Sequence, residues 1–347
     1  MSQTCFIQRI LAGYRDPHFE ELNARLGAEL IVCADPPSKG YAQLHSTSYE
    51  LVQAGWIRIC RIRLMPLRTF ISLFRRCDRF IHFADFKYLS LWALLLLSLV
   101  TRKKVWLHGQ GGYKRSSALQ KFVYRLAISL SSGYICYTPY SAEQLKAKLP
   151  ERLHHKIYIV DNTLMMDSVP ETTTVTEDRL LYLGRLRPGC GIEFLLDATR
   201  DLGLIVDVIG HIEAEHKEVL LNRYPHAVFH GGIFELAEQA KIARACLAGI
   251  YGGDAGLSVL HYMALGLPVI VHDNISMHQG PEACYVKDGI NGLTFNRGDA
   301  DALAASVRRL RDDTDLRNRL AEGALATFRD LTQPSMAEKF ERIVEPD

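Results

Sequence analysis

The sequence predicts two α/β domains, each built on a doubly wound parallel sheet. Runs rich in β-branched and aromatic residues alternate with longer helical stretches in two successive series, the pattern of repeated strand–helix–strand units. A polar stretch over 166–177, MDSVPETTTVTE, separates the two series. The 347 residues, 48% of them hydrophobic, are enough to bury two cores. We therefore expect domains over 1–165 and 166–332.

In the first domain, six apolar runs bounded by turn residues predict strands, and five stretches between them predict helices. The expected strands span 5–11, 29–34, 80–83, 104–107, 133–137 and 156–160, and the expected helices about 17–26, 64–76, 88–100, 116–131 and 141–148. The longest apolar run, 89–100, is well short of the ~20 residues that span a bilayer. The chain is therefore expected to be soluble or to lie on a membrane.

The second domain repeats the alternation and ends in a series of helices. The expected strands span 180–183, 204–209, 227–230, 247–251 and 268–271, and the expected helices about 191–201, 213–223, 235–246, 258–265, 299–312, 314–329 and 334–344. Ligands of such sheets bind at the carboxyl ends of the strands, so we expect the site in a cleft where the two domains face each other. Neither domain contains GxGxxG or GxxxxGK[ST], which argues against a nicotinamide dehydrogenase or a P-loop kinase.

Charge is unevenly distributed between the two halves. Residues 1–160 carry 23 Lys and Arg against 10 Asp and Glu, whereas 161–347 carry 18 against 29. The stretch 51–125 alone holds 15 basic residues and two acidic ones. A basic half favours an anionic partner such as a phospholipid surface, a lipid diphosphate or nucleic acid, and no nucleic-acid-binding motif accompanies it. The eight scattered cysteines and the lack of a signal-peptide pattern predict reduced thiols in the cytoplasm.

A glycine turn after the expected strand 247–251 is the most informative segment. Gly252 and Gly253 break the strand, and Gly256-Leu257-Ser258 then opens a short helix. A glycine turn at a helix N-terminus presents backbone N–H groups and allows close approach of a phosphate. Asp254 and His261 flank this position and can hydrogen-bond sugar hydroxyls. Taken alone, the glycines fit an ordinary strand–helix turn better than a phosphate site.

The run 251–273 resembles the donor-binding segment of GT4-type retaining glycosyltransferases, which typically reads E-G-F-G-L-S-x-L-E-A-M-A-x-G-x-P-V-I. The matching positions are Gly256, Leu257, Ser258, Leu260, Met263, Ala264, Gly266, Pro268, Val269 and Ile270. Gly253 and His261 replace the two glutamates of the motif. The resemblance implies the GT-B fold, in which two Rossmann-like domains face a cleft and a last helix, here 333–347, crosses back onto the first domain.

Further segments match the same family. Gly184-Arg185-Leu186 resembles the segment whose Arg and Lys neutralise the donor diphosphate, with Cys190 in place of the lysine and Arg187 as a second cation nearby. Glu282, in a turn similar to G-x-P-E, either orients a donor-binding loop or lines the pocket. The run 288–293 resembles the family's D-G-x-N-G-L turn.

In the first domain, His108-Gly109 resembles the family's H-G turn, where the His points at the donor sugar. Gly13, Tyr14 and Arg15 occupy the place of the glycine loop near donor phosphates and acceptor. Asp85 is the candidate base for an inverting mechanism, or else a helix N-cap.

The resemblance implies transfer of a sugar from a nucleotide-diphosphate donor to a lipid-linked saccharide during cell-surface polysaccharide assembly. Retention of configuration, with no metal or other cofactor, is expected for this group. The basic amphipathic stretch 55–80 predicts peripheral attachment to an anionic membrane at its cytoplasmic face, although it also fits a core-packing helix. Two alternatives stay open: an inverting enzyme with Asp85 as base, and an inactive glycan- or nucleotide-binding subunit. The sequence does not specify an oligomeric state.

Overall fold

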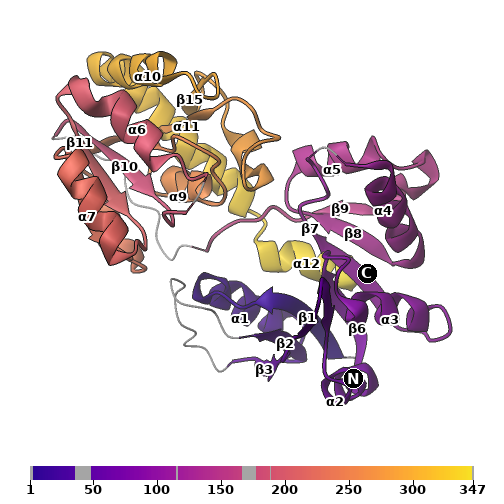
Figure 1. Cartoon of the computed structure of the whole chain (residues 1–347). Coiled ribbons are helices and arrows are strands. Elements are labelled where there is room, and N and C mark those ends of the chain that lie inside the picture. The colour runs from indigo at the N-terminus through magenta and orange to yellow at the C-terminus, as the bar shows by residue number, and fades with distance from the viewer. Residues whose placement is uncertain (1–2, 36–47, 115, 166–176, 188, 346–347) are drawn as a thin grey trace. The chain divides into compact units, whose positions relative to one another are not determined.

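The computed structural model describes residues 3–35, 48–114, 116–165, 177–187 and 189–345. The chain divides into two compact units, Met1–Met165 with Pro334–Asp347, and Met166–Gln333 (Figure 1). We call them unit 1 and unit 2. The expected linker lies almost entirely outside the described residues.

Unit 1 is built on a parallel seven-stranded sheet in the order β3-β2-β1-β6-β7-β8-β9. Its strands are β1 (Gln3–Ile10), β2 (Leu30–Asp35), β3 (Glu50–Gln53), β6 (Cys77–Phe83), β7 (Lys104–Gly109), β8 (Gly133–Cys136) and β9 (Ile157–Ile159). The order reverses between β1 and β6. The chain thus leaves these two neighbouring strands in opposite directions, which opens a crevice at their carboxyl ends.

Helices cover both faces of this sheet because successive strand residues point to opposite sides. One face packs against α2 (Leu67–Arg76), α3 (Leu89–Ser98), α4 (Ala118–Leu130) and α5 (Pro139–Lys146), and the other against α1 (Asp16–Arg25) and α12 (Met336–Val344). On β1, Cys5 and Ile7 belong to the first core, whereas Phe6 belongs to the second and contacts Phe19 and Phe340. The last helix of the chain is therefore part of unit 1.

Unit 2 has a parallel six-stranded sheet in the order β12-β11-β10-β13-β14-β15. The strands are β10 (Arg179–Leu183), β11 (Ile205–Ile209), β12 (Ala227–Gly231), β13 (Cys246–Ile250), β14 (Val269–His272) and β15 (Gly292–Phe295). The helices are α6 (Ile192–Thr199), α7 (Ala214–Arg223), α8 (Leu236–Ala243), α9 (Ser258–Ala264), α10 (Ala300–Asp312) and α11 (Thr314–Thr332). Here the order reverses between β10 and β13. The predicted fold class, two doubly wound α/β domains, is confirmed.

Several strands were not predicted. Residues 55–64 were assigned to an amphipathic stretch, but they form the hairpin β4 (Ile57–Ile59) and β5 (Ile62–Leu64), and α2 begins only after Pro66. The alternation of Ile and Arg has a period of two, which is a strand pattern. Residues 288–293 were interpreted as a turn, but the edge strand β15 begins within them, at Gly292. No helix of the described residues is long and apolar enough to cross a membrane.

Buried histidines should make the fold acid-sensitive. Burial lowers the pKa of His82 to about 4. Its Nδ1 donates to the Phe83 carbonyl at 2.7 Å, and its Nε2 accepts from the Ser90 hydroxyl at 3.0 Å. Between pH 6.5 and 4 the unfolded chain binds a proton at this residue that the folded chain does not. Stability should therefore fall on acidification, by about 1.4 kcal/mol per pH unit for this one histidine.

Urea unfolding at pH 7, 6 and 5 tests this prediction. The pH slope of the free energy of unfolding should be smaller in His82→Gln than in the wild type, and unchanged in a variant of the exposed His155. Equal slopes in His82→Gln and the wild type would contradict it.

Candidate active site

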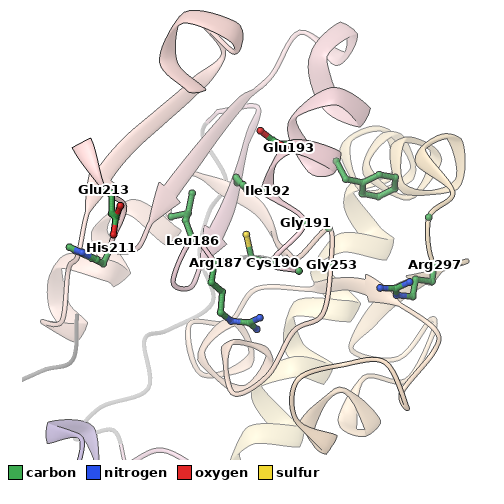
Figure 2. A pocket seen from close by; sticks show the side chains of 14 residues that line it. Leu186, Arg187, Cys190, Gly191, Ile192, Glu193, His211, Glu213, Gly253 and Arg297 are labelled. Carbon is green, nitrogen blue, oxygen red and sulfur yellow. The ribbon is translucent and has the colours of Figure 1, made fainter. Parts of the chain in front are cut away.

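A cavity of about 770 Å³ lies in unit 2 at the carboxyl ends of the strands, around the reversal between β10 and β13 (Figure 2). Two loops form its floor, the loop from β10 to α6 and the loop after β13. Its walls are completed by residues that follow β11 and β15. The lining residues are Leu186, Arg187, Gly189, Cys190, Gly191, Ile192, Glu193, Phe194, His211, Glu213, Gly252, Gly253, Arg297 and Gly298.

The two floor loops pack backbone against backbone. Asp254 donates its N–H to the Gly189 carbonyl at 3.0 Å. A Cβ on Gly253 would lie 2.6 Å from the Gly189 oxygen, and one on Gly191, which has φ 69°, would lie 2.3 Å from the Gly253 nitrogen. Such contacts require glycine on both sides.

This packing joins the two departures from the family motif. Gly253 stands where the motif has its first glutamate, and Cys190 where it has lysine. The Cβ position of Gly253 is 2.8 Å from the Cys190 carbonyl carbon, and the Cys190 side chain is buried. The two replacements therefore lie in one loop-on-loop contact, whose close packing leaves no room for a side chain at position 253.

Arg185 and Arg187 follow β10 and bring positive charge to the site. Arg187 Nη2 donates to the Asp254 carbonyl at 3.2 Å and also to Gln279 Oε1. Arg185 is exposed on the same loop. Burial raises the pKa of the Tyr251 hydroxyl, and the nearby Arg187 and Arg185 act in the opposite direction. Both guanidinium groups thus lie close to Tyr251, at the carboxyl end of β13.

Asp254 is fixed by a network from the neighbouring strands. Its Oδ1 accepts from Arg297 Nη2 at 3.2 Å and lies 3.3 Å from His272 Nε2. The His272 ring stacks on His278 with centroids 3.7 Å apart. His278 accepts from the Ala255 N–H at 3.0 Å and donates to the His272 carbonyl at 2.9 Å, which fixes it as a neutral tautomer. Burial lowers the pKa of His278 to about 4, in agreement.

Sequence reasoning missed Arg297 and this histidine stack. Arg297 lies after the edge strand that was not predicted, and no family motif marks it. It lines the cavity and pairs with Asp254. Two arginines, at 187 and 297, and two glutamates, at 193 and 213, therefore line the cavity, with the carboxylate of Asp254 beside them.

The remaining predicted donor residues surround α9. Gly256 and Leu257 precede the helix and Ser258 begins it. A Cβ on Gly184, next to Arg185, would lie 3.4 Å from Ser258 Oγ, so the two segments are neighbours. His261 is half-buried in α9, and burial lowers its pKa to about 4, so the ring is neutral at pH 7.

Glu282 is buried in a short 3-10 helix, Pro281–Tyr285. Its Oε2 would lie 2.0 Å from a Cβ on Gly280, so this glycine makes room for the carboxylate. The preceding Gln279 donates its N–H to the Ala255 carbonyl at 2.8 Å, which places the turn beside the glycine segment of the site.

The predicted residues of unit 1 lie around a second cavity, of about 320 Å³, at the β1–β6 reversal. It is lined by Gln8, Arg9, Ile10, Ala12, Tyr14, Phe83, His108 and Tyr137. Gly13, Tyr14 and Arg15 form a 3-10 turn at its edge. Arg15 turns away: its guanidinium donates to Asn162 Oδ1 and to the Thr163 carbonyl at 3.2 Å, and thereby ties the start of α1 to the segment after β9.

His108 lies near the carboxyl end of β7, and Asp85 follows the neighbouring strand β6. His108 is 3% exposed among Phe6, Tyr137 and Phe340, and burial together with Arg15 lowers its pKa to about 3. A ring with so low a pKa is neutral at pH 7 and a weak base. The following Gly109 packs closely, because a Cβ there would lie 2.9 Å from the Tyr134 hydroxyl.

Asp85 does not cap α3 as one of its two interpretations expected. The helix begins at Leu89 with Tyr88 as N-cap, and Asp85 Oδ1 accepts from the Lys87 N–H at 3.1 Å in a local turn. Its carboxylate is half-buried just beyond β6. No group of three or more His, Cys, Asp or Glu side chains within the described ranges is arranged to hold a metal ion.

Solved structures with this architecture are GT-B glycosyltransferases. Anabaena HepE in complex with UDP-glucose has a TM-score of 0.68 at 14% identity, over 99% of both chains. The lipopolysaccharide outer core galactosyltransferase WaaB has a TM-score of 0.69 at 13% identity, again over 99% of both. A mutant of S. aureus TarM bound to Fondaparinux, alpha-GlcNAc-glycerol and UDP has a TM-score of 0.71 at 9% identity, over 99% of this chain and 100% of that one. The chain therefore has the GT-B fold.

Sequence comparisons also find similarity to glycosyltransferases. Residues 177–313, within unit 2, match the family model described as Glycosyl transferases group 1. The alpha-D-kanosaminyltransferase of Streptomyces kanamyceticus is 22% identical over 229 residues, which are 59% of this chain and 58% of that protein. The chain thus spans less than two thirds of this curated relative. The fold and the family match together support a transferase of glycosyl groups.

Proposed function

We propose that the chain transfers a sugar from a nucleotide-diphosphate donor to a lipid-linked saccharide, with retention of configuration and without a metal ion, in cell-surface polysaccharide assembly. The observation that carries the donor part is the arginine-lined cavity at the β10–β13 reversal, inside the segment that matches the family model. HepE and TarM, with the same fold, have structures with UDP-glucose and with UDP. The acceptor and the stereochemistry rest on the motif resemblance.

The proposed chemistry places the donor diphosphate against Arg185, Arg187 and the Gly256–Ser258 turn. Negative charge develops on the diphosphate as its bond to the sugar breaks, so positioned cations lower the barrier. Guanidinium groups at this position neutralise the diphosphate, as a metal ion does in other transferases. In a retaining reaction the departing diphosphate accepts the proton of the acceptor hydroxyl on the same face of the sugar.

Asp254 is the group we assign to the sugar hydroxyls of the donor. The motif carboxylate is missing at position 253, and Asp254 is the neighbouring carboxylate that Arg297 and His272 hold in one orientation. A fixed acceptor of this kind discriminates between sugars, because a hydroxyl in the wrong place leaves it unpaired.

The test is a thermal-shift screen of UDP-, GDP- and ADP-sugars, followed by product analysis with the donor that binds. We expect one nucleotide class to raise the melting temperature, nucleotide release on turnover, and NMR signals of a product with the anomeric configuration of the donor. Binding without any turnover indicates the inactive subunit. An inverted product, lost in Asp85→Asn, indicates an inverting enzyme.

Unit 1 also carries features of a membrane-docking surface. In the β4–β5 hairpin, Ile57, Ile59 and Ile62 are 45–53% exposed and lie on one face. The next helix, α2, adds Leu67 at 71% exposure and Ile71 at 40%. Exposed arginines at 61 and 68 accompany them. We call this set the docking face. Apolar side chains in a basic surrounding suit the interface of an anionic bilayer, here the cytoplasmic leaflet.

Replacing Ile59 by Asp should weaken attachment to vesicles. Sedimentation with vesicles that contain anionic lipid should show binding that falls with salt, and about tenfold weaker binding for Ile59→Asp because an isoleucine no longer enters the interface. Val219→Asp is the matched control, since Val219 is 59% exposed on α7 of unit 2. Equal attachment to neutral vesicles, or equal losses in both variants, would contradict docking by this face.

A further inference from the structure

The cavity of unit 1 is electropositive, and its cation lies on an irregular strand. Ile7 of β1 pairs with Cys33 and Ile10 with Asp35, so Gln8 and Arg9 together oppose Ala34. Such a bulge re-aims side chains and is frequent beside active sites. Arg9 lines the cavity and is exposed, and no carboxylate is among the lining residues. The wall thus offers a guanidinium group, a neutral imidazole at His108 and aromatic rings.

A second arginine lies behind one wall of this cavity. Phe83 lines the cavity, and its ring centroid is 4.4 Å from that of Tyr88. Arg63 of β5 forms a β-bridge with Tyr88 and donates its N–H to the Lys87 carbonyl at 2.9 Å. Burial and the nearby Asp85 raise the pKa of the Tyr88 hydroxyl, whereas the nearby Arg9 and a hydrogen bond with Arg63 lower it, so both guanidinium groups lie close to this residue. Within the described part of the chain, neither has an ion pair with a carboxylate.

Resting on the proposed function, we propose that Arg9 and Arg63 form a phosphate subsite beside the unit 1 cavity, and that the acceptor is a saccharide carrying a phosphate or diphosphate. One guanidinium group can donate two parallel hydrogen bonds to two oxygens of a phosphate. Two arginines can therefore bind the two phosphates of a diphosphate. The saccharide would occupy the cavity between Tyr14, Phe83 and Tyr137.

The hairpin explains how such a phosphate reaches the subsite. On β5, Arg63 points away from the exposed Ile62, because neighbouring strand residues face opposite sides. One short strand therefore carries both an isoleucine of the docking face and an arginine of the subsite. With the docking face in the lipid interface, the arginine lies near headgroup depth, where the phosphate of a lipid-linked saccharide is found.

Binding of farnesyl diphosphate and of inorganic diphosphate to the full chain tests the subsite. We expect Arg9→Gln and Arg63→Gln each to weaken farnesyl diphosphate binding about tenfold, the loss typical of one charge-assisted contact. The control is Arg152→Gln. Arg152 is exposed and precedes β9, an edge strand of the same sheet, so this variant should bind farnesyl diphosphate within twofold of the wild type. Equal weakening of inorganic diphosphate identifies the phosphate as the recognised group, and weakening of the farnesyl compound alone identifies the lipid diphosphate.

Two outcomes would overturn the subsite: no binding of farnesyl diphosphate to the wild type, or the same affinity in both glutamine variants. The affinity for the nucleotide sugar should stay within twofold in every variant, and a variant that loses it has lost more than this subsite. If no nucleotide sugar binds at all, the proposed function fails while the diphosphate measurement still stands, so the two failures are distinguishable. Arg63→Lys, which keeps the charge, should recover part of the affinity.

Discussion

Restoring the family glutamate by Gly253→Glu should weaken donor binding by roughly ten- to hundredfold and destabilise unit 2. The new Cβ would lie 2.6 Å from the Gly189 oxygen and 2.7 Å from the Gly191 nitrogen, so the floor loops must separate. Overpacking against backbone costs about 1–3 kcal/mol, or about 2–4 °C in melting temperature for each kcal/mol. Differential scanning calorimetry and titration with the nucleotide sugar measure the two effects.

Gly256→Ala is the matched control because it separates fold from binding. A Cβ at this position would meet Gln279 at 3.8 Å, an ordinary contact, so the melting temperature should be unchanged. Donor affinity should nevertheless fall, since the methyl group occupies the approach to the Gly256–Ser258 turn. A stable Gly253→Glu variant with better donor binding would show that the loops adapt and that the motif role is recoverable.

The order of elements could be predicted because most strands of both sheets are buried on two faces. Such strands appear as continuous apolar runs like 180–183 or 269–271, which need no tertiary information to recognise. The hairpin β4–β5 and the edge strand β15 break this rule. The hairpin strands have only three residues each and alternate Ile with Arg, so they form no continuous apolar run. The strand β15 begins at a glycine and pairs with β14, which lies about twenty residues earlier in the chain.

Site residues were predictable where a family motif places them and unpredictable where the fold brings distant segments together. Arg185, Arg187 and Asp254 lie in motif segments that meet at the β10–β13 reversal. Arg297 and Asp254 are 43 residues apart in the sequence. They meet because β15, which precedes Arg297, pairs with β14. The family resemblance predicted that Arg15 lies near the donor phosphates. In the structure Arg15 is buried and donates hydrogen bonds to Asn162 and Thr163, so it holds the loops of unit 1 together.

The missing motif lysine and glutamate illustrate the same limit. Read one at a time, Cys190 and Gly253 look like two losses that favour an inactive domain. In space they lie in one contact between two loops, in which close backbone packing takes the place of the glutamate at 253. Charged groups stay close to this contact: Arg187, Arg297, Glu193 and Glu213 line the cavity, and Arg185 and Asp254 lie on its loops. The site thus keeps charged groups of both signs.

Arg185→Ala should lower kcat/KM for the nucleotide sugar by roughly ten- to hundredfold, because one charge-assisted contact to the donor diphosphate contributes about 1.5–3 kcal/mol. The loss should appear mainly in kcat, since the negative charge on the diphosphate grows as its bond to the sugar breaks. Arg185 is exposed on its loop, so the fold should tolerate its removal. Arg185→Lys should recover only part of the rate, because an ammonium group cannot donate two parallel hydrogen bonds to two phosphate oxygens.

Arg244→Ala serves as the control. This exposed arginine follows α8 and precedes β13, at the amino end of the strands of the same sheet, and its loss should leave kcat/KM within twofold of the wild type. Equal kinetics of Arg185→Ala and Arg244→Ala would remove Arg185 from the diphosphate site and leave Arg187 as its principal cation.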